Sequence, residues 1–178
     1  MNKEEAGMIH IYTGEGKGKT TAAIGLAIRA AGSGKKVVLL QFLKGSYTSE
    51  LEILNQIEQI KVMRLSKAYP FLRDMTAEDK AAMTAEQNEL LQKALKMVED
   101  GECDVLILDE IMAAYQHHTV DKQLVHYFVE QKPYGLELVM PGRNAREYFI
   151  EKADYVTEML KKKHPFDAGY GARKGIEY

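Results

Sequence analysis

The chain has 178 residues, of which 46% are hydrophobic and 28% charged. This length and composition predict one compact globular domain and argue against a disordered chain. Lys and Arg number 24 against 26 Asp and Glu, so the formal net charge of −2 offers no basic surplus for binding nucleic acid. A single cysteine, Cys103, excludes an internal disulfide and a cysteine zinc cluster. Residues 1–5 are polar and no apolar run approaches the ~18 residues of a membrane helix, so we expect a cytoplasmic protein.

Short apolar runs alternate with amphipathic stretches along the whole chain. The runs that predict strands are residues 8–12, 36–42, 60–65, 104–109, 136–140 and 154–159. The stretches that predict helices are residues 20–31, 50–59, 76–100, 120–131 and 144–152. Such alternation is typical of βαβ units, so we predict a single-domain α/β fold over residues 1–178, with a parallel sheet covered on both faces. Residues 160–178 are expected to form an irregular tail.

Two of the predicted helices carry start signals. Thr76 and Asp79 resemble the two ends of a capping box at the start of the third helix. Thr119 is the expected N-cap of the helix over 120–131.

A glycine-rich segment with the sequence T-G-E-G-K-G-K-T-T lies between the first strand and the first helix, where a phosphate-binding loop is found. Glycines there let backbone N–H groups face a phosphate, and the helix N-terminus adds a favourable dipole. We expect Lys19 to reach the terminal phosphates and Thr20 to bind Mg²⁺. The nucleotide-binding residues predicted from this segment are Thr13, Gly14, Glu15, Gly16, Lys17, Gly18, Lys19, Thr20 and Thr21. Thr13 replaces the usual first glycine of the motif, and the alternative is a glycine-rich turn that binds nothing.

Two acidic residues, Asp109 and Glu110, end the most apolar of the predicted strands. In open parallel sheets ligands bind beyond the carboxyl ends of the strands, where a carboxylate can hold Mg²⁺ directly or through water. The alternative is a solvated turn charge or a helix cap. Together with the phosphate loop, the pair predicts a three-layer domain of the P-loop NTPase (RecA-like) type.

The remaining chemistry-bearing residues give no further site. No Ser–His–acid arrangement is present, and His10 and His126 are expected to be packed or surface residues. Cys103, beside an apolar strand, is expected to be a small buried hydrophobe. The residues therefore predict an ATP and Mg²⁺ site without an evident general base.

Beyond this, the sequence resembles the P-loop type ATP:corrinoid adenosyltransferases. The resemblance covers about residues 8–178. Threonine at the first position of the phosphate loop is usual in that family. The segments that carry the resemblance are the phosphate loop with Arg29, residues 41–45 (Q-F-L-K-G), residues 108–110 (L-D-E), and the tail segments 163–169 (K-H-P-F-D-A-G) and 174–178 (K-G-I-E-Y).

The resemblance implies transfer of the 5′-deoxyadenosyl group of ATP to the Co(I) of a reduced corrinoid, either cobalamin or cobyrinic acid diamide, with release of triphosphate. Because Co(I) is itself a strong nucleophile, such an enzyme needs no protein base; it positions C5′ and stabilises the leaving group. Lys19, Thr20 and Glu110 are the implied catalytic residues. Thr20 and Glu110, with Asp109 close by, are the implied ligands of Mg²⁺, or of Mn²⁺ in its place.

The resemblance further implies that Arg29 and Arg143 are placed toward the nucleotide. A flavoprotein electron donor and a homodimer are the implied partners, with no nucleic acid and no membrane. The usual T-G-R after the fifth strand is replaced by residues 141–143 (P-G-R), so that loop is expected to hold its ligand differently. Some members of the family carry a Phe and a Trp in the loop beyond the third strand, but this chain has no Trp. Tyr69 and Phe71 lie in about that place and are the candidates for an aromatic wall beside the corrinoid. The alternative is that they only pack their loop.

Two other functions remain open from the sequence. A P-loop ATPase or phosphotransferase would release ADP or phosphate instead of triphosphate. A nucleotide or corrinoid carrier would bind without turnover. A nucleic-acid motor is disfavoured, because the basic residues form no stripe and the net charge is slightly negative.

Overall fold

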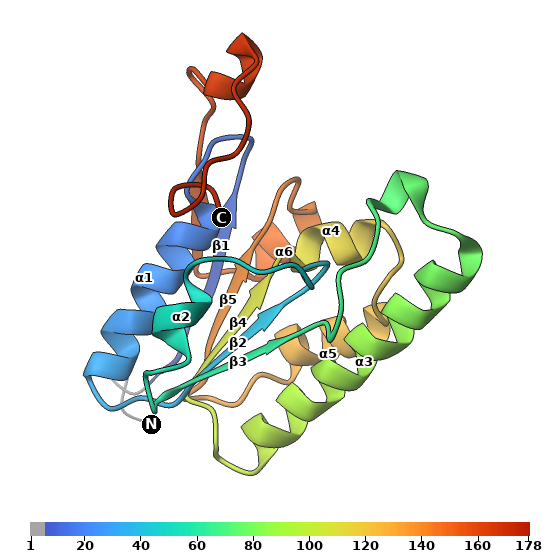
Figure 1. Ribbon diagram of the computed structural model, residues 1–178. Coiled ribbons are helices and arrows are strands. Elements are labelled where there is room, and N and C mark those ends of the chain that lie inside the picture. The colour runs from blue at the N-terminus through green and yellow to red at the C-terminus, as the bar shows by residue number, and fades with distance from the viewer. Residues whose placement is uncertain (1–5) are drawn as a thin grey trace.

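The computed structural model describes residues 6–178 and confirms the predicted α/β class (Figure 1). The strands are β1 (Ile9–Thr13), β2 (Val37–Gln41), β3 (Ile60–Arg64), β4 (Val105–Asp109), β5 (Glu137–Pro141) and β6 (Tyr155–Glu158). All pairings are parallel, in the order β3-β2-β4-β5-β1-β6. The helices are α1 (Lys19–Gly32), α2 (Leu51–Leu54), α3 (Ala77–Glu99), α4 (Ile111–Gln116), α5 (Lys122–Glu130) and α6 (Glu147–Lys152), with the short 3₁₀ turns η2 (Leu72–Asp74) and η3 (Pro165–Ala168). The polar residues 1–5 lie outside the described residues.

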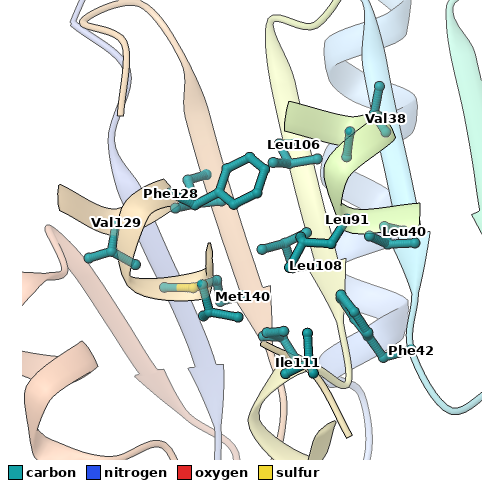
Figure 2. Close-up of a cluster of buried hydrophobic side chains, with 14 of the residues drawn as sticks. Val38, Leu40, Phe42, Leu91, Leu106, Leu108, Ile111, Phe128, Val129 and Met140 are labelled. Carbon is teal, nitrogen blue, oxygen red and sulfur yellow. The ribbon is translucent and has the colours of Figure 1, made fainter. Parts of the chain in front are cut away.

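Helices cover both faces of the sheet, as the alternation predicts. Successive strand residues point to opposite faces, so the central strands β2 and β4 are buried throughout and are apolar except for their last residues, Gln41 and Asp109. One face packs against α3, α4, α5 and α6, where Leu40, Leu108 and Phe128 belong to one buried cluster (Figure 2). The other face packs against α1, where Leu39 and Ile107 belong to a second cluster. Because all the strands are parallel, their carboxyl ends form one edge of the three-layer domain.

Helix α1 lies close against the sheet because its buried stripe is made of alanines. Ala23, Ala27 and Ala30 recur at helical spacing and are buried. Small side chains let the helix backbone approach the strands, and the first turn of α1 consequently sits directly beyond the end of β1. This arrangement fixes the position of the phosphate loop that connects the two elements.

Several predicted element limits were wrong, each for a tertiary reason. Helix α2 covers only Leu51–Leu54 of the predicted 50–59, because i→i+3 hydrogen bonds then reverse the chain into β3. Helix α6 starts at Glu147 and not at residue 144, since Asn144 is left-handed with φ +54° and Arg146 is extended. Helix α4 was not predicted: its six residues are largely apolar and show no helical alternation.

The predicted N-cap of α5 was also wrong. Asp121 caps the helix, and its carboxylate accepts from the N–H groups of Gln123 at 2.8 Å and Leu124 at 3.3 Å. Thr119 is buried, and its hydroxyl donates to the carbonyl of Ala114 at 3.3 Å, which closes α4 instead. The capping box of α3 is present as predicted.

After β6 the chain leaves the sheet, forms η3 and returns so that its last residues lie beside the start of α1 (Figure 1). Most side chains of residues 160–178 are exposed. Within the described residues, no helix combines the length and apolarity that crossing a bilayer requires.

Candidate functional site

The phosphate loop connects β1 to α1 at the edge where all the parallel strands end (Figure 1). Gly18 is the N-cap of α1 and has φ +117°, a conformation that residues with a Cβ rarely adopt. The N–H of Gly16 donates to the carbonyl of Met159 at 2.6 Å, so the segment after β6 supports the loop from behind. The loop thereby has the strand-to-helix setting that anion binding at a helix N-terminus requires.

Lys19 is the most enclosed cation of the loop, with 8% of its surface exposed. Its ammonium donates to the carbonyls of Gly14 at 2.6 Å and Gly16 at 2.7 Å, and so spans the loop. Burial lowers the pKa of Lys19, and the nearby Arg143 lowers it further. An anion arriving at the loop would therefore meet a positive charge that is poorly solvated, and such a charge binds anions strongly.

Asp109, at the end of β4, joins the loop to the neighbouring strands. The hydroxyl of Thr20 donates to Asp109 Oδ1 at 2.9 Å, while Lys44 Nζ lies 2.7 Å from Oδ2. The amide of Gln41 approaches the same Oδ2 at 3.4 Å. Asp109 is 1% exposed, and this hydrogen bonding and the ion pair balance the cost of burying its charge.

Glu110 follows Asp109 in a left-handed conformation, with φ +62°, and is the N-cap of α4. Its N–H donates to the carbonyl of Pro141 at 3.0 Å, which ties the ends of β4 and β5 together. Burial raises the pKa of Glu110, and the adjacent Asp109 carboxylate raises it further. A carboxylate in this setting is poorly compensated and gains by binding a cation.

These oxygens fit a magnesium ion accompanied by phosphates. Thr20, Asp109 and Glu110 supply only oxygen donors, and Mg²⁺ in nucleotide sites takes one or two carboxylates and completes its shell with phosphate and water. Gln41 Oε1, buried in the same group, has no hydrogen-bond partner within residues 6–178 and is an unused acceptor. Across those residues, no group of three or more His, Cys, Asp and Glu could hold a metal without such help.

Two cavities adjoin at the phosphate loop. The one over the loop has a volume of about 330 Å³ and contains the loop cations together with Glu110, Arg143 and His164. The other has about 450 Å³ and lies between α1, residues 44–50 and the last residues of the chain. Both are lined by Thr20, Thr21, Lys44, Ile176 and Glu177.

Two cations that line the cavity over the loop are paired with carboxylates. Lys17 Nζ lies 3.0 Å from Glu177 Oε1, and Arg143 Nη1 lies 2.6 Å from Glu15 Oε2. Hydrogen bonds from Arg173 and Lys17 lower the pKa of Glu177 to about 2, so it is ionised at neutral pH. A bound polyphosphate would compete with these side chains for the same cations.

The structure gathers most of the residues that the sequence singled out. Lys19, Thr20, Asp109, Glu110 and Arg143 converge on the phosphate loop. Four others line neither cavity. Thr13 accepts from the Ala145 N–H through its hydroxyl, and Arg29 is exposed in the last turn of α1. Tyr69 donates to Glu86 from the loop after β3, and Phe71 is 77% exposed in that loop.

Sequence reasoning missed several residues that line the cavities. Lys44 was noted only as part of the Q-F-L-K-G segment, and His164 and Glu177 only as part of the tail. No local pattern marks them, because each reaches the loop from a distant part of the chain. Cys103 is buried as predicted, and burial raises the pKa of its thiol to about 12.

Comparison with known proteins agrees with this geometry. The family model described as ATP:corrinoid adenosyltransferase BtuR/CobO/CobP matches residues 5–178. The corrinoid adenosyltransferase of Escherichia coli K12 is 34% identical over 99% of this chain and 88% of its own length; that of Salmonella typhimurium is 33% identical over the same shares. A corrinoid adenosyltransferase of a Sinorhizobium species is 34% identical over 98% of this chain and 82% of its own.

Solved structures add only a distant likeness. The EssC ATPases 2 and 3 of Geobacillus thermodenitrificans align with 98% of this chain and 36% of theirs, with 16% identity and a TM-score of 0.49. The match of the family model to nearly all of the chain carries the assignment. The chain belongs to the ATP:corrinoid adenosyltransferase family and is a transferase.

Proposed function

We propose that this protein transfers the 5′-deoxyadenosyl group of ATP to the Co(I) of a reduced corrinoid and releases triphosphate. The observation that carries the proposal is the whole-chain match to the family, on a site whose cations surround a phosphate loop. In this reaction the cobalt electron pair forms the Co–C5′ bond as the C5′–O bond breaks, and the triphosphate leaves with that bonding pair.

The residues of the loop would act on the leaving group. Negative charge develops on the triphosphate as the C5′–O bond breaks, and Lys19, Lys17 and Arg143 are the cations that would stabilise it. Thr20 and Glu110, with Asp109, would hold Mg²⁺, which supplies additional positive charge at the phosphates. The main task of the protein is then to position C5′ in line with the cobalt.

The corrinoid would lie at the same edge of the sheet, beyond the carboxyl ends of the strands. Phe71 is 77% exposed in the loop after β3, which leaves its ring available as an apolar wall. We expect Phe71→Ala to slow reduction of bound cob(II)alamin more than it weakens ATP binding. Equal effects on both would rule out this role for Phe71.

Two partners belong to the proposal. Co(II) must gain an electron before it can attack C5′, and a flavoprotein is the donor class we propose. We also propose a homodimer as the working form. The preferred corrinoid, cobalamin or cobyrinic acid diamide, is to be determined by comparing the two as substrates.

The test is an anaerobic assay in dim light with purified protein, Mg·ATP and chemically reduced cob(I)alamin. We expect the spectrum of adenosylcobalamin and one equivalent of triphosphate for each cobalt–carbon bond. The control is Lys19→Ala, for which the rate should fall at least about a hundredfold, because a donor to the leaving group is removed. ADP or phosphate without a new cobalt–carbon bond would indicate a phosphotransferase, and binding without turnover would indicate a carrier.

A further inference from the structure

Lys44 is a cation of this site that has no role in the scheme above. It follows the end of β2, and its ammonium lies 2.7 Å from the Oδ2 atom of Asp109. Its side chain lines both of the adjoining cavities. Because Asp109 is 1% exposed, solvent screens this ion pair weakly, and the pairing is strong enough to position the lysine.

The backbone around Lys44 is held in a strained form. Leu43 has φ +59°, which is costly for a residue with a Cβ, and its N–H donates to Gln87 Oε1 at 2.7 Å. Gly45 lies so close to Lys67 that an added Cβ would collide with the Lys67 carbonyl. Strain persists only where the surroundings enforce it, and here it turns the chain so that Lys44 reaches back across the end of β4.

Asp109 differs from the other carboxylates that pair with cations beside the loop. Glu177 and Glu15 are partly exposed and pair with Lys17 and Arg143 at the rim. Asp109 is buried and shares its carboxylate with the hydroxyl of Thr20, an expected ligand of Mg²⁺. Removing Lys44 from Asp109 would leave a buried charge unpaired, unless another cation takes its place.

We propose that Lys44 is a phosphate-binding residue that exchanges partners. In the free protein it neutralises Asp109; when Mg²⁺ engages Asp109, the ammonium turns to the triphosphate of ATP. The exchange keeps every buried charge paired, and it couples metal binding to triphosphate binding through one side chain. This inference rests on the proposed function, since it takes the loop to be the triphosphate site.

The test measures two affinities of the purified protein that need no corrinoid. Inorganic triphosphate is titrated calorimetrically at saturating Mg²⁺, and Mn²⁺ alone is titrated by electron paramagnetic resonance. For Lys44→Met we expect triphosphate affinity to fall about tenfold or more, because a charge-assisted hydrogen bond is lost. We expect Mn²⁺ affinity to rise several-fold, because the competing ammonium is gone. The matched control is Lys61→Met, which removes an exposed lysine of β3, and both affinities should stay unchanged.

Opposite shifts support the exchange, and a purely structural role cannot produce them. If Lys44→Met weakens both affinities or changes neither, the exchange is refuted. Lys44→Gln, whose amide can still donate to Asp109, must give the same opposite shifts, and it carries the test if the methionine variant does not fold. If the unmodified protein binds no triphosphate, the proposed function fails, and this outcome is distinct from failure of the exchange.

Discussion

Gln87 of α3 offers the sharpest test of how the site is held, because its side chain joins two segments of the chain. Its Oε1 accepts from the N–H of Leu43 at 2.7 Å, and its Nε2 donates to the carbonyl of Thr119 at 2.7 Å. The residue is fully buried. Gln87→Leu nearly preserves the volume and removes both hydrogen bonds, so two backbone groups lose a partner. At about 1–3 kcal/mol for each group left unsatisfied, the free energy of unfolding should fall by about 2–6 kcal/mol.

The assay is urea denaturation followed by circular dichroism. Gln92→Leu makes the same substitution at an exposed position of the same helix and should change the free energy of unfolding by less than about 0.5 kcal/mol. Because the Leu43 N–H holds the turn that carries Lys44, Gln87→Leu should also weaken triphosphate binding in the fraction that stays folded. If Gln87→Leu is as stable as Gln92→Leu, the two hydrogen bonds contribute nothing and the reasoning is refuted.

Three further predictions follow from the charges and burial of named groups. Because burial raises the pKa of Glu110, its folded-state pKa lies above its ordinary value of 4.5; stability is then lost as the pH rises through that raised pKa. With EDTA present to remove metal ions, Glu110→Gln should therefore have a higher melting temperature than the unmodified protein at pH 8. This difference in melting temperature should disappear below about pH 4.5, and an equal difference at both pH values would contradict the reasoning. Glu177→Gln frees Lys17 and should tighten inorganic triphosphate binding several-fold, whereas weaker binding would mean that Glu177 helps to hold the anion. Cys103, with its pKa raised from 9.0 to about 12, should react with iodoacetamide at pH 8 on the order of a thousandfold more slowly than a free thiol, and labelling at the free-thiol rate would show that it is accessible.

Much of the fold could be predicted because it is encoded locally. The apolar runs and amphipathic stretches predicted the parallel sheet and its two covered faces, since a strand buried on both sides is largely apolar. The capping box at Thr76 and the phosphate loop before α1 are likewise patterns within a few residues. Such signals need no knowledge of the rest of the chain.

Element limits depended on neighbours that the sequence does not identify. Thr119 and Asp121 are both good N-cap residues, and only packing decided between them. Thr119 is buried against α4 and accepts from Gln87 through its carbonyl, so the chain extends two residues further before α5 begins. Helix α4 forms because its apolar residues pack into the buried cluster on one face of the sheet. Its six residues are too few to show the helical periodicity from which it could have been predicted.

The sequence by itself determined the fold class and located the glycine-rich loop and the acidic strand end, because each is a pattern within a few neighbouring residues. Tertiary structure alone decided which distant side chains complete the site. Lys44 meets Asp109 across 65 residues of sequence, and Lys17 meets Glu177 across 160. The order of the strands brings β2 beside β4, and the returning tail brings Glu177 to the loop. No periodicity or motif spacing encodes such contacts, because they arise only when the strands are ordered in the sheet.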